Sequence, residues 1–349
     1  MSIFITIICT IIIFSLLIFI HELGHFLAAR AFNVKVNKFA IGMGPALLKW
    51  GKGETEYSIR LFPIGGYAEM EGEDEDSNNP RAFTNAKPYQ KIIILAAGAF
   101  FNLLSGFLLC VIVMGSIAKV PVPIIKEVIP GSAIEQAGLA SGDQIIAIDG
   151  HKTKMQSQVN SRLARSNGEP IDVLYKRNGE LYNVNITPQF DEAQGRYLLG
   201  FYTSEVDNNL GNAFVFGWNH FTFVTTETFT NLKDLVLGKL GFDQVSGPVG
   251  IVSAIGGSVD DVVDNESYAI QNLIGLFLLI SISLGVFNIL PFPALDGGRI
   301  IFAIIEAIIR KPVPIEKEAI VHAIGFALLI ILVLFVTGHD IMRLVNPTS

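Results

Sequence analysis

The chain has 349 residues, of which half are hydrophobic and only 16% are charged. Charged residues make up roughly a quarter of a soluble domain, so this composition indicates an integral membrane protein with some soluble mass. The net charge of −7 excludes nucleic acid as an expected partner, because domains that bind nucleic acid are basic.

The first predicted element is a membrane helix over residues 3–31. Residues 3–20 contain no charged side chain, and an apolar run of this length predicts a helix that spans the bilayer. The run lacks a basic segment before it and a small-residue cleavage site after it. We therefore interpret it as a retained helix and not as a signal peptide.

The later half of this helix carries an H-E-x-x-H motif, formed by His21, Glu22 and His25. Positions four apart share one face of a helix, so both imidazoles can bind one metal ion while Glu22 acts as general base on a water beside it. The motif is short and also occurs by chance on soluble helices. Ionisable side chains are costly in a bilayer and are usually functional there, which favours a zinc site.

Residues 32–90 are predicted to be a polar loop with a β-hairpin. Basic residues in and beside this loop place it on the cytoplasmic side by the positive-inside rule, with the N-terminus outside. Alternating polar and apolar residues at 56–61, followed by a turn at 63–67, predict the hairpin. Two interpretations stay open: an ordinary surface hairpin, or an edge that dips toward the metal and pairs with an extended substrate.

A second membrane helix is predicted over residues 91–118, so that residues 1–118 form the first membrane half. Gly98 and Gly106 give this helix a small-residue face suited to close packing. Asn102 lies between them at membrane depth. It either packs against the metal-binding helix or bonds a backbone carbonyl, and we favour packing.

Residues 119–205 are mixed in character, charged, and rich in short strand patterns. A short helix at 132–136, a Gly-Leu-x-x-Gly-Asp turn at 138–143 and a strand that ends in Ile-Asp-Gly at 148–150 resemble a bacterial PDZ domain, which is an α+β fold. This resemblance implies that a peptide or a free C-terminus binds by adding a strand to an exposed edge. The alternative is a structural spacer that binds nothing.

Residues 206–267 are predicted to be an amphipathic region on the membrane surface. The stretch 211–237 is rich in aromatic side chains but is interrupted by glycine and threonines, which suits a helix lying in the interface better than one that spans the bilayer. A rigid turn is expected at 246–250, where the sequence reads Ser-Gly-Pro-Val-Gly.

Residues 268–349 are predicted to form the second membrane half. A third span covers 268–290, a polar segment follows, and a fourth span covers about 317–337. Basic residues again place the segment between these spans in the cytoplasm. The expected fold is a polytopic α-helical membrane protein with about four transmembrane helices, a cytoplasmic-side hairpin and an inserted extracytoplasmic PDZ domain.

A catalytic zinc site needs a third protein ligand beside the two histidines. Asp296 is the best candidate, because it follows the break of the third span at Pro291 and Pro293 and is expected on the same side of the membrane as His25. The glycines that flank it let the backbone approach closely. An aspartate here can instead cap a short helix.

These motifs together resemble those of the site-2 proteases, peptidase family M50, and within it the bacterial regulator-of-sigma type. The resemblance covers essentially the whole chain. It rests on the H-E-x-x-H motif in the first span, on the PDZ pattern after the second, and on Asn288-x-x-Pro291-x-Pro293-x-Leu295-Asp296-Gly297. It implies that His21, His25 and Asp296 bind zinc, that Glu22 is the general base, and that Asn288 holds the substrate.

The resemblance also implies the activity and its setting. The expected protein is an intramembrane zinc metalloprotease of the bacterial inner membrane, with its active site toward the cytoplasm and the PDZ domain outside. Its expected partners are the lipid bilayer, a peptide at the PDZ domain, and single-span membrane proteins, such as an anti-sigma factor, cut within or near the bilayer. The best-known Gram-negative members carry two tandem PDZ domains, and this sequence shows one. A second hypothesis is a membrane-tethered PDZ protein with a non-catalytic metal site.

Overall fold

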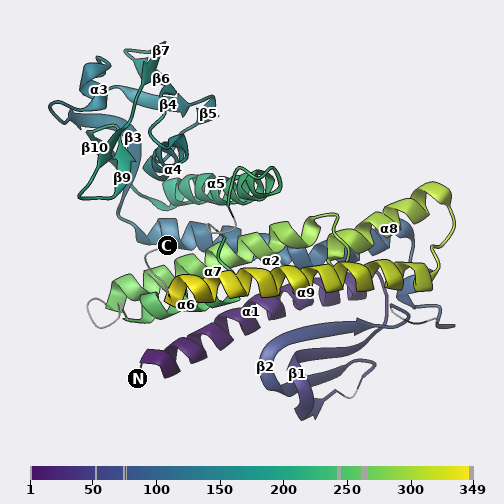
Figure 1. The fold of residues 1–349 in the computed structure, drawn as a ribbon. Helices are drawn as coiled ribbons and strands as arrows, with labels where there is room; N and C mark the ends of the chain where they lie inside the picture. The colour runs from purple at the N-terminus through teal and green to yellow at the C-terminus, as the bar shows by residue number, and fades with distance from the viewer. Residues whose placement is uncertain are drawn as a thin grey trace. The chain divides into compact units, whose positions relative to one another are not determined.

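A computed structural model gives the fold (Figure 1). It describes residues 2–51, 53–73, 75, 77–241, 245–260 and 266–345. The chain divides into two compact units, one made of Met1–Leu109 with Val224–Ser349 and the other of Cys110–Phe223.

Four helices in the described part of the chain are long and apolar enough to cross a membrane, as the sequence predicts. They are α1 (Ser2–Ala31), α2 (Pro88–Ser116), α7 (Glu266–Ile289) and α9 (Ile315–Val345). The last of these is longer than the predicted 317–337, because its helix continues through polar residues at both ends. The chain is thus a polytopic helical membrane protein that also contains β-structure.

The small-residue face of α2 packs as expected against a neighbouring span. A Cβ added at Gly106 would lie 2.5 Å from Ile282 on α7, and one added at Gly285 of α7 would lie 2.8 Å from Leu103 on α2. Both glycines are therefore needed for the close approach of the two helices, as in other membrane helix pairs.

The region predicted as 206–267 contains two helices in its described part, whereas the sequence predicts one. The first, α5 (Leu210–Val236), is the helix expected there. The second, α6 (Pro248–Asp260), packs against α1, α7 and α9, with Ile255 and Val259 buried among apolar side chains of α1 and α7. Residues 242–244 and 261–265 lie outside the described part.

The rigid turn predicted at 246–250 is also wrong in part, because residues 248–250 form the first turn of α6. Proline is favoured at the first position of a helix, where its missing N–H costs nothing. The remaining N–H groups need an acceptor, and the buried carboxylate of Asp340 on α9 supplies it. Its oxygens accept from Gly247 N at 3.3 Å and Gly250 N at 2.8 Å.

The polar segment predicted after Asp296 is instead a helix, α8 (Asp296–Ile309), whose buried face carries Ala303 and Glu306. The start of α8 lies directly against the end of α7. A Cβ added at Gly297 would lie 2.0 Å from the carbonyl oxygen of Leu290. Glu306 pairs with Lys91 of α2 at 2.7 Å, which compensates two charges that are both buried.

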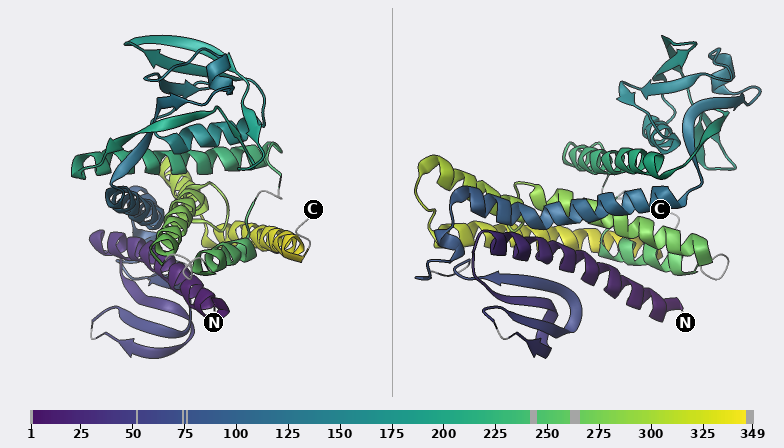
Figure 2. Two further views of the ribbon diagram at one scale, coloured as in Figure 1. Left: turned by 90° about the vertical axis from the view of Figure 1, so that its left-hand side faces the viewer. Right: turned by 180° about the vertical axis from the view of Figure 1, so that it is seen from behind.

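The predicted hairpin is a larger sheet, made of two bent 15-residue strands, β1 (Val36–Trp50) and β2 (Glu56–Met70). The strands pair antiparallel, and residues 38–41 of β1 have partners on both sides, 66–69 and 56–59. Figures 1 and 2 show this sheet beside α1, and Phe39 packs against Phe19 and Phe26 of that helix. A short 3-10 helix, η1 (Phe83–Asn85), precedes α2.

The β domain, residues 119–207, lies in the second unit. Its main sheet has the strand order β10-β3-β4-β6-β7, β5 pairs with β4, and β8 and β9 form a separate ribbon. The elements are β3 (Lys119–Val128), α3 (Ala133–Gln136), β4 (Gln144–Ile148), β5 (His151–Lys152), α4 (Gln156–Ser166), β6 (Ile171–Arg177), β7 (Glu180–Ile186), β8 (Gln189–Asp191), β9 (Arg196–Leu198) and β10 (Phe201–Asp207). The short helix and the strands expected from the sequence are all present.

One ion pair fixes the turn of the β domain that the sequence singles out. Arg177 donates two hydrogen bonds to the buried carboxylate of Asp143, at 2.8 Å from Nε and 2.5 Å from Nη2. Burial alone raises the pKa of Asp143, but the bonds from Arg177 and from the Ala140 N–H outweigh it and lower that pKa below its ordinary value. The turn at 138–143 is thereby tied to β6.

Candidate metal centre

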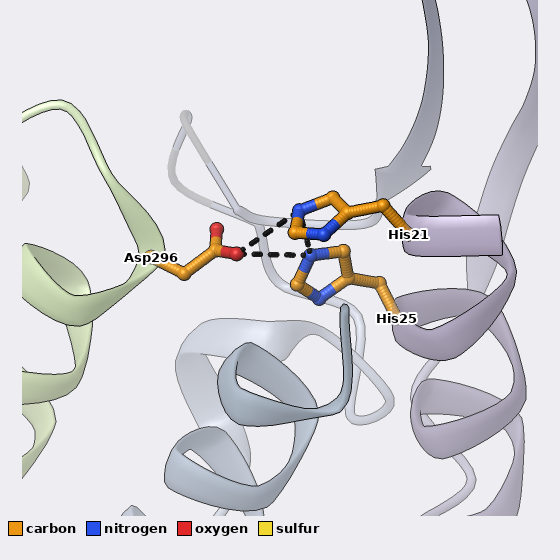
Figure 3. Close-up of side chains that lie close together, drawn as sticks. All are labelled: His21, His25 and Asp296. Carbon is orange, nitrogen blue, oxygen red and sulfur yellow. Dashed lines mark hydrogen bonds and ion pairs between the residues drawn. The ribbon is translucent and has the colours of Figure 1, made fainter. Parts of the chain in front are cut away.

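Three side chains meet at one point, two from α1 and one from the start of α8 (Figure 3). His21 Nε2 and His25 Nε2 lie 3.2 Å apart, because positions four apart on a helix stack on one face. Asp296 Oδ2 lies 3.1 Å from His21 Nε2 and 3.4 Å from His25 Nε2. The structure therefore brings together all three residues that the sequence predicts as ligands.

The size of this triangle suits zinc. Ligand atoms about 2.0–2.1 Å from a tetrahedral zinc ion lie about 3.3 Å from one another. The three separations, 3.1–3.4 Å, fall around that value. The donor set of two imidazoles and one carboxylate leaves the fourth tetrahedral position to water or substrate, as catalytic zinc sites require.

The protonation of His25 also fits a cation. Its Nδ1 lies 2.9 Å from the carbonyl oxygen of Ile94, which can only accept, so Nδ1 carries the proton and Nε2 presents its lone pair. Asp296 Oδ2 is buried and faces both Nε2 atoms, and within the described part of the chain no other hydrogen-bond donor reaches it. A lone pair and a carboxylate oxygen that point at one another this closely need a positive charge between them.

Helix α2 forms the back wall of the centre through a glycine. A Cβ added at Gly98 would lie 2.3 Å from His25 Nε2 and 2.8 Å from His21 Cε1. One turn further along, the buried Asn102 places Nδ2 3.1 Å from His21 Nδ1. The expectation that Asn102 packs against the metal-binding helix is thus confirmed.

Glu22 is held next to the ligands by the backbone of β2. The N–H of Ala68 donates to Glu22 Oε2 at 3.0 Å, and a Cβ added at Gly66 would lie 3.8 Å from Glu22 Cγ. The edge of β2 at residues 66–68 therefore faces the motif-bearing turn of α1. This hydrogen bond from a backbone N–H holds the Glu22 carboxylate near the two imidazoles.

Asp296 is positioned by the loop that breaks the chain between α7 and α8. Ala294 in this loop adopts φ +77°, a left-handed conformation that is costly for a residue with a Cβ. Its N–H donates to His322 Nδ1 of α9 at 2.8 Å. A Cβ added at Gly325 of the same helix would lie 2.4 Å from Pro293 Cβ. Helix α9 thus supports the loop from outside the centre.

A cavity of about 750 Å³ opens onto the centre, lined by His21, Glu22, His25, Asp296 and residues of β2 and the segment after it. Glu71 lies on its wall. Hydrogen bonds from Ser77, Asn37 and Lys35 lower the pKa of Glu71 to about 2. Glu73, a further lining residue, pairs with Arg299 of α8. The Glu71 side chain on the wall of the cavity is therefore ionised at neutral pH.

Of the predicted site residues, only Asn288 lies outside this group. It is half-buried on the last turn of α7, and it is not among the residues that line the cavity. The sequence reasoning missed the Ile94 carbonyl, the Ala68 N–H and His322. The first two are backbone groups, which have no signature in a sequence.

Within the described residues, four membrane-length helices and a cavity that gathers two imidazoles and two carboxylates are the features of a membrane metalloprotease. Comparison with known proteins gives the family. The family model for peptidase family M50 matches residues 9–332, and the chain belongs to that family.

Relatives along nearly the full length carry matching names. A protein of Clostridium acetobutylicum named as a zinc metalloprotease is 35% identical over 98% of this chain and 99% of its own length. The regulator of sigma-W protease RasP of Bacillus subtilis is 31% identical over 97% of this chain and 99% of its own length. The expected family and enzyme class are confirmed: the chain is a metalloprotease, and its relatives are named for zinc.

Among solved structures, the PDZ domain of an SdrC-like protein of Listeria monocytogenes is similar to part of this chain. The match has 20% sequence identity and a TM-score of 0.20, and it covers 25% of this chain and 90% of the Listeria domain.

Proposed function

We propose that this protein is an intramembrane zinc protease that cuts single-span membrane proteins within or near the bilayer. His21, His25 and Asp296 hold the zinc ion, and Glu22 is the general base. The observation that carries this proposal is the triangle of ligand atoms with Glu22 fixed beside it by the Ala68 N–H.

The chemistry follows from the roles of these residues. Bound zinc supplies a Lewis acid that polarises the scissile carbonyl and makes water a nucleophile near neutral pH. Glu22 accepts the proton of the attacking water and delivers it to the leaving amide nitrogen. The hydrogen bond that the Glu22 carboxylate accepts from the Ala68 N–H keeps it aimed at the centre, so little reorganisation is needed for the proton transfer.

A transmembrane substrate must first expose a peptide bond, because a helix satisfies its backbone groups internally. The edge of β2 at residues 66–68 borders the centre; because the Ala68 N–H is bonded to Glu22, the neighbouring backbone groups of this strand are the ones that pair with a locally extended segment. In this proposal Asn288 holds the same segment further from the zinc. An anti-sigma factor is a substrate of the expected kind, and the Bacillus relative is named as a regulator of sigma-W.

The remaining parts follow the predicted topology. The protein lies in the bacterial inner membrane, with the β1–β2 sheet and the centre on the cytoplasmic side and the β domain outside. There the β domain binds a peptide or a C-terminus through an exposed strand edge. The positive-inside distribution of basic residues supports this orientation.

The test is cleavage of a single-span reporter by the purified wild type and by Glu22→Gln, with zinc content measured in both. The amide cannot act as a base but keeps the size of the side chain, so we expect normal zinc content and a loss of activity of at least about a hundredfold. Equal cleavage by both proteins would contradict the role of Glu22. Loss of zinc in Glu22→Gln would instead make this residue part of the metal site.

The second hypothesis, a peptide-binding protein with a structural metal, is less well supported. A structural zinc site has four protein ligands. The described residues bring together three, and the cavity leaves the fourth direction open.

A further inference from the structure

Asn102 is the only side chain, within the described residues, shown to hydrogen-bond His21 from outside the metal cluster. It is completely buried on α2, and its amide lies 3.1 Å from His21 Nδ1. An uncharged polar group in a membrane helix has an energetic cost unless it is bonded, so this contact needs an explanation.

The direction of the hydrogen bond determines whether His21 can bind a metal. A neutral imidazole has one N–H and one lone pair. If the Asn102 amide nitrogen donates to Nδ1, the proton of His21 is on Nε2 and points into the cluster, where it blocks zinc. If Nδ1 carries the proton, as it does in His25, Nε2 presents its lone pair to zinc.

The two ends of a carboxamide exchange places on a half turn about the Cβ–Cγ bond, so their assignment follows from the bonding partners. The end of the carboxamide that faces away from His21 is buried without a hydrogen-bond partner in the described part of the chain, so the choice of orientation rests on His21. With oxygen toward His21, Oδ1 accepts the Nδ1 proton. Only this orientation is compatible with a zinc ion on Nε2.

We propose that Asn102 is a positioning residue that accepts the Nδ1 proton of His21 through Oδ1 and so holds His21 in its zinc-binding tautomer. The inference rests on the proposed zinc site. It gives the two histidines parallel supports from the same helix, the Ile94 carbonyl for His25 and the Asn102 carboxamide for His21. Such outer partners are typical of metal-binding imidazoles.

The test measures zinc dissociation constants by chelator competition in detergent. Asn102→Leu removes the acceptor at similar volume, and we expect zinc to bind about 10–100-fold more weakly. Asn102→Asp can only accept, and carboxylate–imidazole–zinc pairs are common. We therefore expect Asn102→Asp to bind zinc as tightly as the wild type, whereas it would fail if the amide had to donate.

Ser281→Ala is the matched control. The Ser281 hydroxyl donates to the backbone carbonyl of Asn102 at 3.0 Å. Its removal therefore disturbs the packing around Asn102 and leaves the side-chain amide of Asn102 in place. We expect less than about a threefold change in zinc affinity. The visible spectrum of the cobalt-loaded protein reports the geometry of the centre independently of activity, and it should be unchanged in Ser281→Ala and Asn102→Asp.

Two results would overturn the proposal: zinc affinity within threefold of the wild type in Asn102→Leu, or an equal loss in the Leu and Asp variants. If Asn102→Leu does not fold, as judged by thermal unfolding without metal, Asn102→Ala removes the same acceptor with a smaller side chain.

His21→Ala separates this inference from the proposed function. If His21→Ala loses zinc while Asn102→Leu retains it, only the role of Asn102 fails. If His21→Ala retains zinc, the ligand set itself is wrong.

Discussion

At the scale of single residues, the centre depends on the absence of a side chain at Gly98 as much as on its ligands. The backbone of α2 passes so close to the imidazoles that a single methyl group at this position would overlap His25 Nε2. The wall of the candidate centre therefore leaves room for both rings only because position 98 has no side chain.

We predict that Gly98→Ala lowers zinc affinity by at least about tenfold, with a matching loss of protease activity. The added Cβ would overlap the lone pair of His25, and either the ring or α2 must move. Zinc content after dialysis against a chelator measures the effect. Gly275→Ala on α7 is the matched control, since a Cβ there has no neighbour within 4 Å. Equal zinc content in both variants would contradict the close approach.

The side chains of the centre could be predicted from the sequence, and their backbone partners could not. The four-residue spacing of His21 and His25 fixes their common face on any helix, and the costs of charge in a membrane point to Asp296. The carbonyl of Ile94 and the N–H of Ala68 belong to groups that every residue has. Only the fold shows which of them reach the site.

At the scale of elements, the loop between α7 and α8 stores strain that α9 restrains. Ala294 is held at φ +77° while its N–H bonds His322. A left-handed residue other than glycine costs on the order of 1–3 kcal/mol, so it persists only when its surroundings hold it. This residue lies two positions before Asp296, and the loop thus transmits the position of α9 to a proposed zinc ligand.

We predict that His322→Leu weakens zinc binding by up to about tenfold, because the loop can relax once its acceptor is lost. Ala294→Gly in the same chain should restore most of the affinity, since glycine adopts this conformation without strain. Chelator competition on the single and the double variant gives the comparison. If glycine at 294 has no effect in the His322→Leu background, the backbone strain is not what His322 restrains.

A second element-scale prediction concerns the turn of the β domain. The pKa of Asp143 is lower in the folded chain than in the unfolded one. Its ion pair with Arg177 therefore stabilises the folded β domain fully above the unfolded pKa of about 4, and this stabilisation is lost as the pH falls through the folded pKa. Amide exchange over residues 138–148 of the whole protein, corrected for intrinsic rates, should therefore accelerate below about pH 4. Asp143→Asn should remove this pH dependence, while Asp207→Asn on the exposed end of β10 should leave it intact.

Elements differed in how well the sequence predicted them, and the clarity of their local pattern explains the difference. The spans show long hydropathy runs, and the longer strands of the β domain show an alternation of polar and apolar residues. Helix α6 has 13 residues, and the Gly-Pro-Val-Gly sequence around its start is typical of a turn. It is a helix because Asp340, some ninety residues later in the chain, caps its first turn, and such a contact cannot be read from local sequence.

At the scale of the whole molecule, the proposed topology puts the β1–β2 sheet and the β domain on opposite sides of the membrane. A pair of single cysteines tests this in a chain whose own Cys9 and Cys110 are replaced by alanine. Lys49 on β1 and Glu192 in the β domain are exposed positions for them.

We predict that a membrane-impermeant maleimide added to intact spheroplasts labels Glu192→Cys and not Lys49→Cys. Lys49→Cys should react only after the membrane is permeabilised. Labelling of both in intact spheroplasts, or of Lys49→Cys alone, would contradict the orientation that the basic residues indicate.

The separation of the ligands along the chain also orders events in time. During translation His21 and His25 are made first, and Asp296 follows 275 residues after His21. At about 5–20 residues per second, a growing chain goes on the order of tens of seconds without its third ligand. During that interval a half-made enzyme surrounded by other newly inserted proteins has no complete centre under the proposed ligand set. Synthesis of Asp296 then completes the proposed ligand set and is the step that makes the protease competent.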